Sequence, residues 1–290
     1  MSTSFFSFRG KTSCPYLSGY TWVSFCDWKM LNTDFGNGPV RFNAEEVKRG
    51  STIFVDYNCL RDFAERVLPK IQERFVLVTG NYGYGADHPM PGPFEDLLED
   101  EKIEAWFVQN IDRAPSSKLI PIPIGVANGC WPHGDIEQLK EMESLSQRKN
   151  KRSTFCYLNY TPLPNRADCT AHFRGLGVPF TKRVSFKDYL QDLGESVFVP
   201  SPAGNGLDCH RTWEALLLGC YPIVKSSSLN PLYQGHPVVI VENWVDATLS
   251  FLEEKRREFE SQTFSRDKLY ASFWLEKLRR FSLLFYEKEP

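Results

Sequence analysis

The sequence predicts an α/β protein of two consecutive domains, each built on a parallel sheet, with a cleft between them. Short apolar runs alternate with stretches of helical spacing along most of the chain. A length of 290 residues exceeds one typical hydrophobic core, which favours two domains of ordinary size. A strongly polar segment over residues 136–152 divides the alternation into two series.

The first series contains five short apolar runs that we interpret as strands. The proline-bearing fifth run is expected to be an edge or irregular strand, because proline cannot donate to the ladder. Helical spacing covers residues 59–73 and 94–99. The expected strands are residues 20–25, 52–55, 75–79, 103–108 and 119–124.

The polar segment is interpreted as a surface helix that runs into an interdomain linker, although a merely solvated helix fits its composition almost as well. A second series then alternates strands and helices. Its expected strands are residues 154–159, 197–199, 222–224 and 238–241. Its expected helices are residues 166–176, 186–193, 246–259 and 265–286.

The division that follows is a first domain over residues 1–150 and a second over residues 151–264. A C-terminal helix over residues 265–290 is expected to pack back on the first domain. The sequence contains no internal repeat or low-complexity segment.

Bulk composition excludes several classes of partner. The formal net charge of −2 gives no general attraction to nucleic acid or to an anionic membrane. No apolar run approaches the roughly 20 residues that span a bilayer. The first residues lack the basic start and long apolar centre of a signal peptide. We therefore expect a cytoplasmic protein with no membrane span and no nucleic-acid partner.

The eight cysteines are scattered and none forms a Cys-x-x-Cys pair. Most are expected to be reduced and buried, without disulfides or structural zinc. No Asp-x-Asp lies between apolar strand residues, and the acidic run over residues 95–101 fits a solvated helix face. The sequence therefore predicts no metal.

The most informative segment is residues 199–224, which reads as a strand end, a glycine-rich loop, a short helix and a second buried strand. This order places free backbone N–H groups, with His210 and Arg211, at a helix N-terminus, where anions bind. Glu214 lies on the same helix face. Cations and amides suit a diphosphate, and a carboxylate suits ribose hydroxyls. An ordinary α/β turn over a core at residues 216–218 is the alternative.

Residues 201–220 resemble the donor-binding segment of exostosin-like glycosyltransferases. Residues 106–110, 119–128 and 131–135 are similar to segments of small exostosin-like proteins of microbes and large viruses, among them virus-encoded xylosyltransferases. The resemblance covers roughly residues 75–245. It implies a GT-B fold, in which two Rossmann-like domains with parallel sheets face a central cleft.

The resemblance also implies an activity. It implies inverting transfer of a sugar, expected to be xylose, from a nucleoside-diphosphate donor, expected to be linked to UDP. The acceptor would be an oligosaccharide, such as a glycoprotein glycan, bound mainly by the first domain. The nucleotide sugar is the co-substrate, and no further cofactor is expected. Alternatives are a nucleotide-sugar epimerase or hydrolase, or a non-catalytic module that binds sugar nucleotides.

Roles in donor binding follow for ten residues. Backbone amides near residues 205–207, with His210 and Arg211, would hold the diphosphate, and Glu214 would bind ribose. Arg166 would reach the phosphate across the cleft, or else form a surface salt bridge. Asp208 is expected to be the helix N-cap, and residues 182–186 to meet the base. The candidates are Asn159, Arg166, Arg183, Ser201, Asn205, Gly206, Leu207, His210, Arg211 and Glu214.

Inverting transfer needs a general base, expected in the first domain after a strand end that faces the cleft. The glycine-rich and aromatic loop after residues 75–79 offers Asp87 first and His88 second. The alternative for Asp87 is that it only shapes its turn. Tyr82 and Tyr84 offer faces on which an acceptor sugar could stack, or pack within the loop. Four residues are less favoured as the base: Asp27, Asp56, Asp112 and His133.

Overall fold

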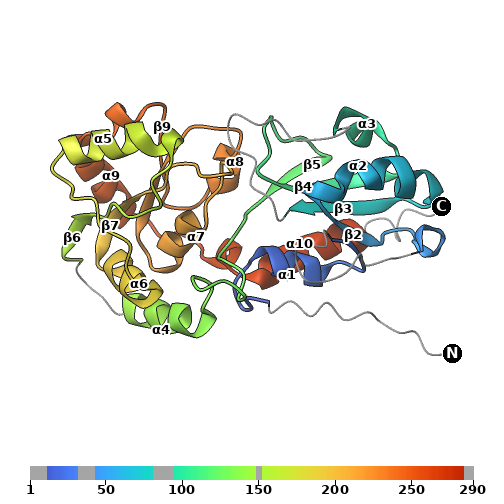
Figure 1. Cartoon of the computed structure of the whole chain (residues 1–290), viewed down its shortest axis with the longest axis horizontal. Helices are drawn as coiled ribbons and strands as arrows, with labels where there is room; N and C mark the ends of the chain where they lie inside the picture. The colour runs from blue at the N-terminus through green and yellow to red at the C-terminus, as the bar shows by residue number, and fades with distance from the viewer. Residues whose placement is uncertain (1–11, 32–42, 81–93, 148–151, 284–290) are drawn as a thin grey trace.

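The computed structural model describes residues 12–31, 43–80, 94–147 and 152–283, and it contains two parallel sheets (Figure 1). The first sheet has the order β1-β2-β3-β4-β5 and the second β6-β7-β8-β9. All strand pairs within them are parallel. The predicted α/β class with two parallel sheets is therefore confirmed.

The strands of the first sheet are β1 Trp28–Met30, β2 Thr52–Asp56, β3 Phe75–Gly80, β4 Ile103–Gln109 and β5 Leu119–Ile122. Those of the second are β6 Thr154–Cys156, β7 Ser196–Pro200, β8 Tyr221–Lys225 and β9 Val239–Val241. β5 is an edge strand, as its proline predicted. β2, β3 and β7 are buried along their whole length, because helices cover both faces of each sheet.

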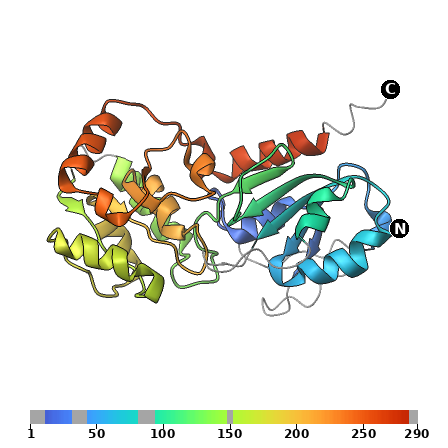
Figure 2. The ribbon, with the colours of Figure 1, turned by 90° about the horizontal axis from the view of Figure 1, so that it is seen from above.

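The helices of the first domain are α1 Gly19–Phe25, α2 Leu60–Asp62, α3 Phe94–Glu99 and α4 Ile136–Gln147. Those of the second are α5 Ala167–Gly175, α6 Phe186–Gly194, α7 His210–Leu217, α8 Asn230–Tyr233 and α9 Leu249–Glu260, and α10 Ala271–Leu283 follows. α2 and α3 lie on one side of the first sheet, and α1 and α10 on the other (Figures 1 and 2).

One expected strand is wrong, because residues 20–25 form most of α1. The Ser18 hydroxyl accepts a hydrogen bond from the N–H of Thr21 and caps this helix. Trp22 and Val23 are fully buried. A buried apolar run of six residues has the same composition in a strand and in a helix, so its pattern could not separate them.

The polar helix predicted before the linker is α4, but its inner face is buried rather than merely solvated. The Glu143 carboxylate accepts hydrogen bonds from Arg266 at 2.5 Å, from Tyr270 at 2.5 Å and from Tyr16. These partners come from the N-terminal segment and from the segment before α10. The contact ties three distant parts of the chain together.

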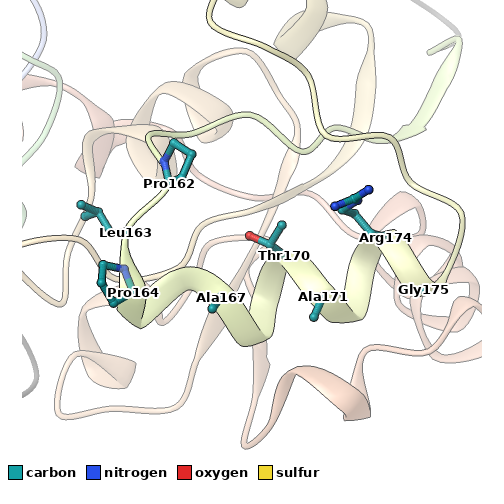
Figure 3. A pocket seen from close by; sticks show the side chains of 8 residues that line it. All are labelled: Pro162, Leu163, Pro164, Ala167, Thr170, Ala171, Arg174 and Gly175. Carbon is teal, nitrogen blue, oxygen red and sulfur yellow. The ribbon is translucent and has the colours of Figure 1, made fainter.

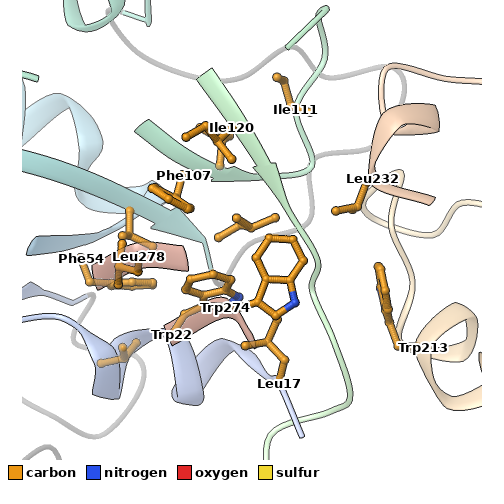
Figure 4. Packing of buried hydrophobic residues seen from close by; sticks show 14 of the residues in the cluster. Leu17, Trp22, Phe54, Phe107, Ile111, Ile120, Trp213, Leu232, Trp274 and Leu278 are labelled. Atoms are coloured by element: carbon orange, nitrogen blue, oxygen red, sulfur yellow. The ribbon is translucent and has the colours of Figure 1, made fainter. Parts of the chain in front are cut away.

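α10 packs against the first sheet, although it follows the second domain in sequence. The ring centroids of Trp274 and Trp22 are 5.8 Å apart, and those of Phe281 and Phe107 are 5.3 Å apart. Figure 4 shows Trp274 beside Trp22 in the first domain, with Trp213 of α7 across the junction from them. The buried cluster that contains Trp274 also includes Trp213, so the two domains share one apolar core.

Candidate functional site

The candidate site lies at the junction of the two domains, where β7 gives way to residues 201–209 and then to α7. We call residues 201–209 the glycine loop. In parallel α/β sheets, ligands bind at the carboxyl ends of the strands. Cys209 is the residue before α7, and its side chain makes no capping bond. The expectation that Asp208 is the N-cap is therefore wrong.

Two glycines allow close packing in the glycine loop. A Cβ atom on Gly204 would lie 2.4 Å from Nη2 of Arg166, and one on Gly206 would lie 2.6 Å from Nδ2 of Asn110. The N–H of Gly204 donates to the carbonyl of Gly206 at 2.9 Å, which closes the turn. Within the described residues, the N–H groups of Asn205, Gly206 and Leu207 have no hydrogen-bond partner. The loop thus keeps donors available for a ligand.

The guanidinium of Arg166 supports the glycine loop through hydrogen bonds to backbone carbonyls. Its Nε donates to the carbonyl of Ala203 and its Nη1 to that of Thr161, both at 3.0 Å. The side chain is buried, and desolvation lowers its pKa, with a further lowering by the charge of Arg211. The surface salt bridge considered for Arg166 is therefore wrong. Arg166 belongs to the same domain as the loop, so it does not reach the site across the cleft.

Arg211 and Glu214 share one face of α7. The charge of Arg211 favours the Glu214 carboxylate, which also accepts a hydrogen bond from Tyr189 Oη at 2.8 Å. Burial outweighs both effects and raises the Glu214 pKa to about 7. The Arg211 guanidinium lies 5.0 Å from the ring centroid of Tyr160. Its Nε is buried without a hydrogen-bond partner among the described residues, so this arginine can still donate to a ligand.

His210 does not supply the positive charge that we expected at the helix N-terminus. Burial lowers its pKa to about 4, which leaves the imidazole neutral at neutral pH. The ring Nδ1 lies 2.7 Å from the carbonyl oxygen of Gly125. Because a carbonyl only accepts, Nδ1 carries the proton and Nε2 is an acceptor. Arg211 is therefore the charged residue of this pair.

Asp208 joins the two domains instead of capping α7. Its carboxylate accepts from the backbone N–H of Ile124 at 2.8 Å and from Trp213 Nε1 at 2.8 Å. Its own N–H donates to Oδ1 of Asn110 at 2.8 Å. Asn110 has a φ of 53°, in the left-handed region that asparagine tolerates better than most residues. Burial raises the Asp208 pKa to about 6.

The other donor candidates are distributed around this centre. Asn159 Nδ2 donates to the carbonyl of Lys182 at 3.2 Å, which holds the exposed Arg183 next to the strand end. The Ser201 hydroxyl is buried and lies 2.9 Å from the hydroxyl of Thr212, so it serves the loop's own packing. Asn205 is exposed.

The favoured base candidates, Asp87 and His88, lie outside the described residues, as do Tyr82 and Tyr84. Two of the less favoured candidates have structural partners. Asp27 accepts from the backbone N–H and the hydroxyl of Thr52, and Asp112 pairs with Arg113 at 2.9 Å.

Asp56 and His133 complete the less favoured candidates. Asp56 is fully buried and accepts from the N–H of Asn58 at 3.0 Å. His133 is exposed, and surrounding atoms and the charge of Arg183 lower its pKa. His133 thus lies near enough to Arg183 of the second domain for that charge to act on it.

An open hollow of about 810 Å³ lies along the outer face of α5 (Figure 3). Arg174 is the one charged side chain that lines it. The hollow therefore brings together none of the groups that could perform acid–base chemistry. Its lining residues are Pro162, Leu163, Pro164, Ala167, Thr170, Ala171, Arg174 and Gly175.

Within the described ranges, no group of three or more histidine, cysteine or acidic side chains is arranged to hold a metal ion. No described helix combines the length and apolar character needed to cross a membrane.

Fold and site together define a two-domain parallel α/β protein with a glycine loop at the domain junction, whose N–H groups at residues 205–207 have no partner among the described residues. No protein-family model matches the chain, and no curated protein matches it. Among solved structures, it is similar to the catalytic domain of starch synthase IV from Arabidopsis thaliana bound to ADP and acarbose. That match has 9% identity and a TM-score of 0.38, covering 80% of this chain and 73% of the other. A likeness this low carries no functional argument.

Proposed function

We propose that this protein is a glycosyltransferase that uses a nucleoside-diphosphate sugar as donor. The observation that carries the proposal is the Arg211–Glu214 face of α7, set directly behind the open N–H groups of the glycine loop. Such a face could bind two chemically different parts of one ligand: the N–H groups and Arg211 suit an anionic diphosphate, and Glu214 suits a ribose.

The diphosphate half is assigned to the glycine loop and Arg211. Among the described residues, the N–H groups of residues 205–207, and those of His210 and Arg211 at the start of α7, are unpaired donors with partial positive charge. The Arg211 guanidinium adds a full charge and a fork that matches phosphate oxygens. As the sugar leaves, these groups stabilise the negative charge that develops on the diphosphate. We therefore propose transfer without a metal ion.

The ribose half is assigned to Glu214. A carboxylate accepts hydrogen bonds from the two adjacent ribose hydroxyls, and Tyr189 orients it from the other side. With a pKa of about 7, Glu214 is only partly ionised at neutral pH in the free protein. Bound hydroxyls favour the ionised form, so donor binding and ionisation of Glu214 support each other. The base of the nucleotide is assigned to residues 182–186, next to Asn159.

The identity of the substrates rests on the family resemblance of the sequence. It supports UDP as the nucleotide, xylose as the sugar, inversion at the anomeric carbon and a saccharide acceptor bound mainly by the first domain. These finer assignments remain part of the proposal.

The test is calorimetric binding of UDP to the wild-type chain and to single variants. Arg211→Ala is expected to weaken UDP binding about 10- to 100-fold, because a charge-assisted phosphate contact contributes about 1.5–3 kcal/mol. Glu214→Ala is expected to lose a similar amount through the ribose. Arg257→Ala, at an exposed position of α9, is the matched control and should bind like wild type.

Unchanged UDP affinity in both site variants would contradict the assigned site. Product analysis with a panel of UDP-sugars then tests the reaction. Transfer that requires an added saccharide supports the proposal. Rapid donor conversion or hydrolysis alone would indicate an epimerase or hydrolase. Tight UDP binding with no product from any donor–acceptor pair would indicate a binding module.

A further inference from the structure

The segment between β5 and α4, residues 123–135, runs between the two halves of the molecule (Figure 1). Two hydrogen bonds fix it to the start of α7. The Ile124 N–H donates to Asp208 at 2.8 Å, and the carbonyl of Gly125 accepts from His210 at 2.7 Å. The segment therefore forms part of the first domain's wall beside the proposed donor site.

The far half of this segment has a fixed shape. Oδ1 of Asn128 accepts from the N–H of Tyr20 at 2.8 Å, and its backbone carbonyl accepts from the N–H of Trp131 at 3.0 Å. A Cβ atom on Gly134 would lie 2.0 Å from that carbonyl oxygen, so only glycine fits there. The tight turn holds the two side chains between these anchors, Trp131 and His133, in one arrangement.

Trp131 and His133 present a flat aromatic surface to solvent. Their rings stack with centroids 6.2 Å apart and an interplanar angle of 22°. Trp131 is 51% exposed, although most tryptophan side chains in the described chain are buried. An indole combines a large apolar face with one polar N–H, which suits the apolar C–H face and polar rim of a sugar ring.

His133 lies near charged and titratable groups of the second domain. Arg183 lies close enough to lower the pKa of His133, and His133 in turn lowers that of His210. Partial burial of the imidazole also lowers the pKa of His133. The imidazole is therefore mostly neutral at neutral pH, the state in which it can accept a proton.

We propose that Trp131 and His133 form the acceptor-sugar subsite: Trp131 carries the sugar ring, and His133 takes the proton of the attacking hydroxyl. This inference rests on the proposed glycosyl transfer and adds a second substrate site to it. The placement on the first-domain wall, next to His210 and Arg183, sets an acceptor sugar opposite the donor held by Arg211 and Glu214.

The step balances with the two substrates alone. The acceptor oxygen forms a bond to the anomeric carbon of the donor, while its proton passes to His133. The bond from the anomeric carbon to the phosphate oxygen breaks, and its electron pair leaves with the nucleoside diphosphate. Histidine then returns the proton to water, so no oxidant or further co-reactant is needed.

The test uses the full chain, the donor that supports turnover in the UDP-sugar panel, and para-nitrophenyl glycosides as acceptor probes. His133→Ala is expected to lower kcat about 10²- to 10⁴-fold with UDP affinity unchanged. Added imidazole should restore part of that rate, which a merely structural role would not show. Trp131→Ala is expected to raise the acceptor KM about three- to tenfold, and Trp131→Phe should recover most of it. Val245→Ala is a control for loss of an exposed apolar side chain.

Wild-type rates in His133→Ala and Trp131→Ala would overturn the subsite. So would loss of turnover in Asp87→Asn, His88→Gln or His210→Gln while His133→Ala stays active, since another group would then take the proton. Each outcome requires an active wild-type chain. If the wild-type chain transfers sugar from no donor to any added acceptor, the proposed function itself fails, and this result is distinguishable from failure of the subsite alone.

Discussion

At the scale of single residues, burial decides what each group in the site can do. His210 and Arg211 are neighbours at the start of α7, yet only Arg211 is available as a cation. His210 is buried against the carbonyl of Gly125, and its pKa falls to about 4. Glu214 responds in the opposite direction, because burial penalises its ionised form. Sequence spacing predicted that these three side chains share one helix face but could not reveal the charge of His210.

The pKa of Glu214 predicts a pH dependence of stability. Its value rises from about 4.5 in the unfolded chain to about 7 in the folded one, so the folded state binds the proton more tightly. The resulting stabilisation is complete below pH 4.5 and is lost as pH rises through 7. Glu214→Gln removes this titration, and the variant should gain about 2–3 kcal/mol relative to wild type between pH 5 and pH 8.

Urea unfolding of both chains at the two pH values measures this difference. Comparing variant with wild type cancels the titrations of Asp208, His210 and His236, which both chains share. A wild-type stability that changes in parallel with that of Glu214→Gln would contradict the raised pKa.

At the scale of elements, the glycine loop and α7 show how local sequence builds the site. Gly206 allows the Asn110 carboxamide to lie against the loop, and Asn110 in turn accepts the N–H of Asp208. The strand, loop, helix and strand order was predictable from the sequence. The hydrogen bond between Asp208 and Asn110 was not predictable, because the two residues are 98 positions apart and no local sequence pattern indicates the contact.

Gly206→Ala is expected to destabilise the protein by about 1–3 kcal/mol, because the new methyl group would overlap the Asn110 side chain. Gly175→Ala is the matched control. A Cβ at Gly175 meets nothing within 4 Å, and alanine is the better helix former by about 0.5–1 kcal/mol. Thermal unfolding should therefore show a lower Tm for Gly206→Ala and an equal or higher Tm for Gly175→Ala. Equal Tm values for both variants would show that the loop does not depend on this contact.

The elements also show where sequence patterns stop being informative. The runs of β2, β3, β4, β7 and β8 were predictable because they are short, apolar and bounded by polar or turn residues. Residues 20–25 have the same composition but form α1, because Ser18 caps them and tertiary packing buries them as a helix. The short strand β1 was missed, since three half-buried residues give no periodic signal.

At the scale of the whole molecule, the two domains behave as one packed unit at the site. Asp208 of the second domain accepts from Ile124 and Trp213, and the hydroxyl of Ser228 donates to the carbonyl of Ile111. The shared apolar core places Trp213 opposite the first domain (Figure 4). Hydrogen bonds from Ile124 to Asp208 and between Gly125 and His210 thereby fix the segment that carries Trp131 and His133 to the start of α7. These long-range contacts depend on tertiary structure. The sequence therefore predicted a cleft between two domains but not which residues connect them.

The proposed function requires that the glycine loop, Arg211 and Glu214 bind a nucleoside diphosphate. A crystal structure of the wild-type chain with UDP tests it most directly. We predict phosphate oxygens within hydrogen-bond distance of Arg211 and of the N–H groups of residues 205–207, and ribose hydroxyls within hydrogen-bond distance of Glu214. UDP bound elsewhere, for example in the hollow along α5, with the Arg211–Glu214 face empty, would contradict it.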